Sequence, residues 1–131
     1  MTEGLTDTSV WICAELGRDL DRAGLPDVLR VSVITLAELQ AGVLAASDPT
    51  TGTTRLRTLQ LAQQSEPLPV DATVSQEWAL LRVEVARAGR RVNVNDLWIA
   101  ATARANRLPV VTQDGDFHVL AALGLIDLVQ V

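Results

Sequence analysis

Short continuous apolar runs alternate along this chain with segments in which apolar residues recur at helical spacing. Short apolar or β-branched runs predict strands, and we place them at 30–35, 67–70, 109–112 and 126–131. Apolar residues that recur at helical spacing predict helices over 36–46, 72–89, 95–107 and 117–124, after a first helix that follows Asp7. The polar stretch "DPTTGTT" at 48–54 is typical of a loop between two helices.

Strands that alternate with helices are typical of an α/β fold. The alternation predicts a small parallel β-sheet flanked by helices on both faces. The chain has 131 residues and shows no repeat or clear linker, so we expect one domain with a single substantial core.

Composition and charge narrow the possible functions. No apolar run is long enough for a bilayer span, and the N-terminus does not resemble a signal peptide, so we expect a cytoplasmic protein with no membrane association. The net charge of −5 argues against a basic coat for nucleic acid but permits a nuclease that uses metal ions. Only four aromatic residues, three Trp and one Phe, are present, which leaves little for base stacking. The single cysteine, Cys13, lies in an apolar stretch and is interpreted as a buried structural thiol.

Several acidic residues lie at or near predicted helix starts, and each has an ordinary structural explanation. Asp7 and Asp116 could cap helices, and Asp96 could be a first-turn acid favoured by the helix dipole. Thr35 and Glu38 have the spacing of a capping box. Considered singly, these acids indicate no chemistry.

Considered together, the same acids predict a metal site. Strand-to-helix junctions of a parallel sheet meet at its carboxyl edge, so acids at several junctions come close together. Carboxylates gathered there repel one another, and divalent cations relieve that repulsion. Mg²⁺ or Mn²⁺ suits carboxylate ligands, whereas the near absence of His and Cys disfavours zinc. Asp71 also follows a predicted strand; we interpret it as a helix N-cap, although spacing alone does not separate it from the cluster.

Four segments, taken in order, resemble the PIN-domain ribonucleases, and most of all the VapC-type toxins of bacterial toxin–antitoxin pairs. The segments are "DTSV", "SVITLAELQAG", "VNVNDLWIAATA" and "VVTQDGDF". The resemblance spans almost the whole chain, although no single motif is specific. One departure is the stretch before Asp7, "MTEGLT", which is short and polar where relatives have a clear apolar strand, so we expect a weak or short first strand.

The resemblance implies a set of site residues. The catalytic and metal-binding acids would be Asp7, Glu38, Asp96 and one or both of Asp114 and Asp116. Asp114 is preferred as the direct ligand because it follows the strand more closely; Asp116 would share the ion, bind it through water or cap the next helix. Thr8, Thr112 and Asn95 would be supporting residues, with Asn95 either an N-cap or a neighbour of the site.

The resulting hypothesis is a toxic endoribonuclease that uses Mg²⁺ or Mn²⁺ to activate water against an RNA phosphodiester bond. The resemblance also implies a homodimer and a cognate VapB-type antitoxin. Two alternatives stay open: a weakly catalytic PIN-fold module that acts within an antitoxin–DNA complex, and a DNase with the same metal chemistry. Outside the acids, His118 is interpreted as a surface or packing residue, and Trp11, Trp78 and Trp98 as packing residues. Four arginines on or after the long helix have two interpretations, RNA or partner contacts and a solvated face: Arg82, Arg87, Arg90 and Arg91.

Overall fold

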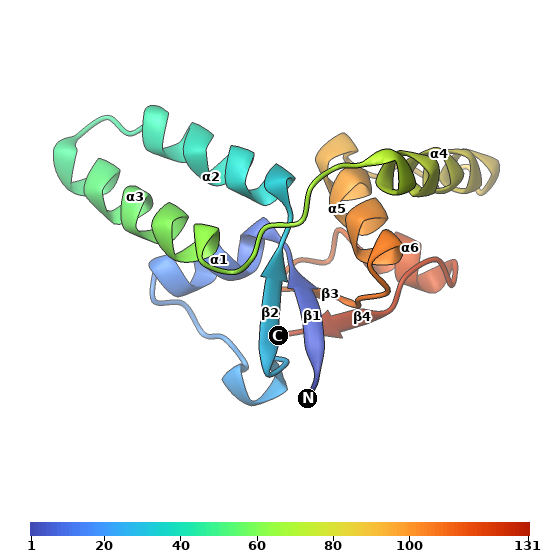
Figure 1. The fold of residues 1–131 in the computed structure, drawn as a ribbon, viewed down its shortest axis with the longest axis horizontal. Helices are drawn as coiled ribbons and strands as arrows, with labels where there is room; N and C mark the ends of the chain where they lie inside the picture. The colour runs from blue at the N-terminus through green and yellow to red at the C-terminus, as the bar shows by residue number, and fades with distance from the viewer.

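Four parallel strands form the centre of the structure, in the spatial order β2-β1-β3-β4. The computed structural model describes residues 1–131, and Figure 1 shows the sheet between two groups of helices. The strands are β1 (Glu3–Thr6), β2 (Val28–Val31), β3 (Val110–Thr112) and β4 (Leu128–Gln130). The helices are α1 (Thr8–Glu15), α2 (Val33–Leu44), α3 (Pro49–Gln63), α4 (Ala72–Arg87), α5 (Val94–Ala105) and α6 (His118–Ala122).

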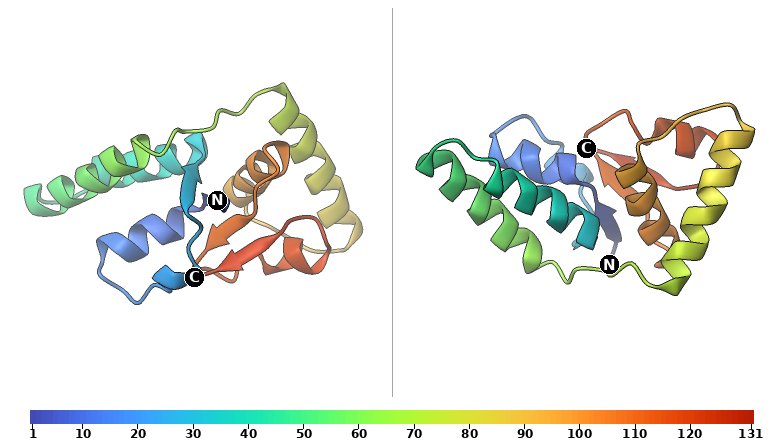
Figure 2. Two further views of the ribbon diagram at one scale, coloured as in Figure 1. Left: turned by 60° about the horizontal axis from the view of Figure 1, so that its bottom comes forward. Right: turned by 90° about the horizontal axis from the view of Figure 1, so that it is seen from above.

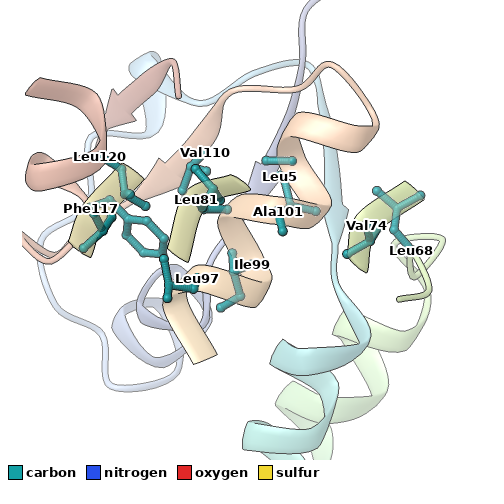
Figure 3. Close-up of a cluster of buried hydrophobic side chains, with 13 residues drawn as sticks. Leu5, Leu68, Val74, Leu81, Leu97, Ile99, Ala101, Val110, Phe117 and Leu120 are labelled. Atoms are coloured by element: carbon teal, nitrogen blue, oxygen red, sulfur yellow. The ribbon is translucent and has the colours of Figure 1, made fainter. Parts of the chain in front are cut away.

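The helices divide between the two sides of the sheet. Helices α1, α2 and α3 lie together on one side, and α4, α5 and α6 lie on the other, as all views show (Figures 1 and 2). The larger core cluster lies between the sheet and the second group, and Leu5, Val110, Ile99 and Phe117 are among its members (Figure 3). A smaller cluster joins α2 to α3 through Leu39, Leu59 and Ala62. The predicted α/β fold, with a parallel sheet and helices on both faces, is confirmed.

The first strand is short, as expected, but it occupies a central position in the sheet. β1 pairs with both β2 and β3, and Leu5 is fully buried. A Cβ atom at Gly4 would lie 2.6 Å from Val111 Cγ2 and 2.9 Å from Pro26 Cγ. Glycine therefore allows the close packing around β1 that a larger residue would disturb.

Polar N-cap residues explain where most helices begin. The side chains of Asp7, Ser32, Asp48, Asp71 and Asn93 each accept a hydrogen bond from the first turn of the helix that follows. The interpretation of Asp71 as a cap is confirmed, since its carboxylate accepts from the Val74 N–H at 2.9 Å. Helix α4 ends before Gly89, which has a φ of 67° and closes the helix as predicted.

Three predicted elements are wrong. The strand predicted at 30–35 ends at Val31, because Ser32 caps α2 and the β-branched residues after it are helical. The loop predicted at 48–54 is the first part of α3, whose N-cap is Asp48 and whose first residue is Pro49. The strand predicted at 67–70 is a single bridge between Leu68 and Ser32.

The aromatic residues pack as predicted. Trp78 of α4 and Trp98 of α5 stack with ring centroids 4.8 Å apart, and Arg82 lies over the Trp78 ring. Trp11 packs against the smaller cluster and donates its indole N–H to Thr6 Oγ1 at 3.0 Å. None of the helices combines the length and apolar content that crossing a lipid bilayer demands.

Candidate active site

A pocket of about 370 Å³ lies where β1 and β3 end and where α1 and α5 begin. Its lining is mostly polar, and it includes all five acids that the sequence analysis selected: Asp7, Glu38, Asp96, Asp114 and Asp116. Asp71 is exposed at the start of α4 and does not line the pocket. The structure therefore separates the clustered acids from the cap, which spacing could not do.

Asp7 is both a helix cap and a member of this pocket. It follows β1 directly, is only 3% exposed, and its Oδ1 accepts from the Val10 N–H at 3.4 Å. Burial raises the pKa of Asp7 from 3.8 to about 6, against hydrogen bonds from Ser9 and Thr112 that lower it. The capping interpretation of Asp7 is thus correct but incomplete.

Two hydroxyl groups hold the Asp7 carboxylate from both sides. Ser9 Oγ donates to Oδ1 at 2.6 Å, and Thr112 Oγ1 donates to Oδ2 at 2.7 Å. Each hydroxyl has one proton, so both are committed to Asp7 and their mutual 3.3 Å contact is not a second bond. Their oxygens accept the backbone N–H groups of Gln113 and Asp114, both at 3.0 Å. This network ties the end of β1 to the loop after β3.

Glu38 reaches the pocket from the second turn of α2. The Thr8 hydroxyl donates to Glu38 Oε1 at 2.7 Å and lies 3.1 Å from the Thr35 hydroxyl. The capping-box interpretation of Thr35 and Glu38 is wrong, because α2 begins two residues before Thr35 and Ser32 is its cap. The supporting role expected of Thr8 agrees with this contact.

Asp96 is half-buried in the first turn of α5 and faces the other acids. Its pKa is raised from 3.8 to about 7, first by burial and then by the negative charges of Asp116, Asp7, Glu38 and Asp114. No hydrogen bond is among these causes, in contrast to Asp7, whose carboxylate accepts bonds from Ser9 and Thr112. The neighbouring negative charges therefore oppose ionisation of Asp96 without a hydrogen bond to offset them.

Asp114 and Asp116 both line the pocket from the loop between β3 and α6. Burial and the charge of Asp116 raise the pKa of Asp114. Thr112 holds the backbone of Asp114, whereas Asp116 has the largest charge effect on Asp96. The alternative that Asp116 caps α6 is wrong, because Phe117 occupies the cap position and no side chain bonds to that end.

The chemistry of the pocket fits a hard divalent cation. Five carboxylates offer oxygen ligands, and burial, with the charges of neighbouring acids, raises the pKa values of three of them. In this structure no three of these side chains converge into a group that could hold an ion. No histidine lines the pocket, because His118 contacts Gln130 outside it. The Cys13 thiol does line the pocket, but it is buried and lies 3.6 and 3.4 Å from the carbonyls of Arg18 and Asp19. The set fits Mg²⁺ or Mn²⁺ better than zinc.

Other predictions about the site are corrected in detail. Asn95 is exposed, does not line the pocket and is not the cap of α5. Asn93 lines the pocket and caps α5, because its side chain accepts a hydrogen bond from the Asn95 N–H at 2.9 Å. None of the four arginines on or after α4 lines the acidic pocket.

Four polar residues that line the pocket were not foreseen from the sequence: Ser9, Arg18, Asn93 and Gln113. Ile12 and Cys13 also line the pocket and had been given no role there. Ser9 and Asn93 had visible signals, namely a hydroxyl two residues after an acid and an Asn before a helix. Arg18 and Gln113 had none.

Comparison with known proteins places this geometry in a family context. The family model described as the PIN domain matches residues 5–123. The chain is 48% identical to ribonuclease VapC5 of Mycobacterium tuberculosis over 128 residues, which cover 98% of this chain and 95% of the relative. It is also 48% identical to ribonuclease VapC4 of the same organism over 124 residues, with 93% and 94% covered.

Solved structures agree with the sequence matches. The crystal structure of VapBC-5 from Mycobacterium tuberculosis, described as a member of the VapBC family of toxin–antitoxin systems, covers 100% of both chains with a TM-score of 0.91 and 44% identity. VapBC2 from Rickettsia felis, solved with a DNA fragment from its promoter, has a TM-score of 0.80 at 22% identity over 98% of both chains. This second likeness shows the fold alone.

Proposed function

The chain belongs to the PIN-domain family, and from that premise we propose that it is a metal-dependent endoribonuclease, the toxin of a VapBC-type toxin–antitoxin pair. Relatives that are 48% identical over nearly the whole chain bear the name ribonuclease, which supports a nuclease. The dependence on Mg²⁺ or Mn²⁺ and the roles of single residues are our own extension.

One observation supports the proposal above the others. Five carboxylates from four separate parts of the chain line a single pocket, and the charges of four raise the pKa of the fifth, Asp96, beyond the effect of its burial. Such an arrangement lowers the stability of a protein without metal, so a purely structural explanation is poor. A site that binds a divalent cation turns the same repulsion into affinity.

The proposed mechanism assigns a task to each group of residues. Asp7, Glu38 and Asp96, with Asp114 and Asp116, would hold one or two Mg²⁺ or Mn²⁺ ions. When bound, such an ion supplies Lewis acidity toward water and toward the phosphate oxygens.

The supporting residues act on the orientation of these acids. Ser9 and Thr112 fix both oxygens of Asp7, and Thr8 fixes one oxygen of Glu38. Because these hydroxyls donate to the carboxylates, they favour the ionised form that a cation requires.

Removal of metal is the direct test of the proposed function. We expect the purified chain to cleave single-stranded RNA in Mg²⁺ or Mn²⁺ at about 5 mM, a concentration chosen to saturate the site. The activity should be lost in EDTA. The measurement is gel analysis of end-labelled RNA, with DNA of the same sequence in parallel. Cleavage that continues in EDTA would contradict the metal mechanism, and cleavage of DNA alone would favour the DNase alternative.

A pH-dependent metal effect on stability is a second expected result. The pKa values of Asp7, about 6, and Asp96, about 7, exceed the value of about 3.9 in an unfolded chain. The folded protein without metal then binds more protons than the unfolded chain between these values, so its stability falls as the pH rises from about 4 to 7. Mg²⁺ should bind the acids only in their ionised form. At about 10 mM, in excess over the expected Kd, it should raise Tm by about 3 °C or more at pH 8 and have little effect at pH 5.

Thermal unfolding followed by circular dichroism measures both effects, with NaCl of equal ionic strength as the control. Asp27 and Asp48 do not contribute to the stability change in this pH range. Hydrogen bonds lower their pKa values, so the stability that they provide is lost only at a pH below about 4. An equal rise of Tm at both pH values would argue against ion binding by the pocket.

Partners follow from the family and from a neighbouring groove. A groove of about 250 Å³ between α1, α2 and α3 shares Ile12 and Glu38 with the acidic pocket and exposes the apolar side chain of Leu16. We propose that a VapB-type antitoxin binds there and closes the pocket; a structure described as a member of the VapBC family of toxin–antitoxin systems, 44% identical to this chain, supports a partner of this kind. A homodimer is part of the same proposal, and Leu80 and Val83 on α4 are exposed apolar residues that a second copy could cover.

A further inference from the structure

We infer that Arg18 is a substrate-positioning residue that binds a phosphate of the RNA next to the one that is cleaved. The inference rests on the proposed ribonuclease function and adds a residue that the PIN-type acid set does not include. Arg18 is the one basic residue that lines the acidic pocket. The residue is exposed to solvent.

The backbone of Arg18 is held in place by the end of α1. Gly17 has a φ of 66°, and its N–H donates to the Ala14 carbonyl at 3.3 Å. The Arg18 N–H donates to the Cys13 carbonyl at 3.0 Å. These two bonds form a Schellman motif, which reverses the chain direction after the helix and directs Arg18 back to the pocket.

Two side chains that line the pocket also contact the backbone of the turn that contains Arg18. The Cys13 thiol lies 3.6 Å from the Arg18 carbonyl and 3.4 Å from the Asp19 carbonyl. Gln113, which directly follows β3, donates its side-chain N–H to the Asp19 carbonyl at 3.0 Å. The position of Arg18 is therefore coupled to the loop that contains Asp114, and its flexible side chain starts from a fixed point.

Arg18 makes no ion pair although five acids share its pocket. The four ion pairs of the structure use other arginines, namely Arg30, Arg87 and Arg104. An arginine that served to neutralise the acids would lie against one of them. The guanidinium of Arg18 is instead left free for a partner from outside the protein.

The substrate supplies the anion that suits this guanidinium. RNA brings one negative charge per nucleotide to a pocket whose acids repel it, and bound cations would offset that repulsion only at the scissile phosphate. The phosphates on either side need a donor of their own, and a guanidinium binds phosphate through two parallel hydrogen bonds. Arg18 is exposed, whereas Asp7 is buried and Asp96 is half-buried, so we assign Arg18 to the adjacent phosphate and the acids to the scissile one.

Steady-state kinetics with a single-stranded RNA oligonucleotide and Mg²⁺ test this role. Because the contact exists equally in the ground state and the transition state, Arg18→Ala should raise KM about tenfold and change kcat by less than about twofold. The slope of log(kcat/KM) against log salt should become shallower by about 0.7, as expected for one lost contact to single-stranded nucleic acid. Arg18→Lys should recover part of the loss.

Arg22→Ala is the matched control, because it removes the same charge four residues away from an exposed position that does not line the pocket. An equal rise of KM in Arg22→Ala would show that net charge alone causes the effect, and it would overturn the inference. An unchanged KM and salt slope in Arg18→Ala would also overturn it. Unfolding curves of both variants show whether they are folded.

Binding measurements separate this inference from the proposed function. Fluorescence anisotropy with labelled RNA and Ca²⁺ compares the affinities of the wild type, Arg18→Ala and Arg22→Ala without turnover. If the wild type binds RNA but never cleaves it, the proposed function fails, and a weaker affinity of Arg18→Ala alone still supports the role of Arg18. If the wild type binds no RNA, both fail.

Discussion

Replacement of Asp96 by asparagine is expected to lower the proposed metal-dependent RNA cleavage at least about 100-fold, because it would remove one proposed metal ligand and misplace the others. Asp96 is the acid whose ionised form the protein supports least, and four other carboxylates act on it. Asparagine has nearly the same shape but no charge, so it should relieve repulsion. The metal-free variant should melt at or above the temperature of the wild type at pH 8, and Mg²⁺ should no longer raise its Tm.

Asp71→Asn is the control for this experiment. It makes the same chemical change at an N-cap outside the pocket, where asparagine caps a helix about as well as aspartate. It should retain cleavage within about twofold. Growth arrest on expression, present in the wild type and absent in Asp96→Asn, would favour a toxic enzyme. Arrest by both would favour the non-catalytic regulatory module, and cleavage by Asp96→Asn at the wild-type rate would refute the site.

Thr112→Val is expected to have the second largest effect, a loss of about 10- to 100-fold in metal affinity or in kcat/KM. Thr112 is fully buried at the end of β3, donates to Asp7 Oδ2 at 2.7 Å and accepts from the Asp114 N–H at 3.0 Å. Valine fills the same space without a hydroxyl. It would leave the buried Asp7 Oδ2 and the part-buried Asp114 N–H without these partners and lower the free energy of unfolding by about 1–3 kcal/mol.

Thr112→Ser separates the hydroxyl from the methyl group. Serine keeps the donor and the acceptor and should retain most of the activity, within about fivefold of the wild type. The measurements are kcat/KM, the Mg²⁺ concentration at half-maximal rate, and Tm. A valine variant with the metal dependence of the wild type would show that Asp7 needs no fixed orientation.

The acids show why local chemistry alone was insufficient. Asp7 and Asp71 have the same local role, since each accepts a hydrogen bond from the first turn of its helix. Only Asp7 also faces Asp96, because β1 lies in the middle of the sheet, whereas α4 begins after the chain has left the sheet. The three-dimensional structure therefore separates two acids that spacing along the chain could not.

The helices and strands were predictable where local signals agreed. Helix α4 has a polar cap, helical spacing and a terminal glycine, and its predicted position is confirmed within two residues. The segment after Val31 had conflicting signals, because its β-branched residues favour a strand while Ser32 favours a helix start. Packing of Leu39 against α3 decides for the helix. Residues 49–54 are helical although Thr and Gly are weak helix formers, because Asp48 caps α3 and Pro49 begins it.

By itself, the sequence determined the α/β class, most helix boundaries and the set of acids that lie near helix starts. These properties depend on side-chain spacing and caps, which act within a few residues. The tertiary structure decided that the acids share one pocket, that Asn93 and not Asn95 lies there, and that Arg18 joins them. Those outcomes depend on strand order, on the close packing of Gly4 beside β3 and on a turn held by Gln113, all of which are contacts between residues far apart in the chain.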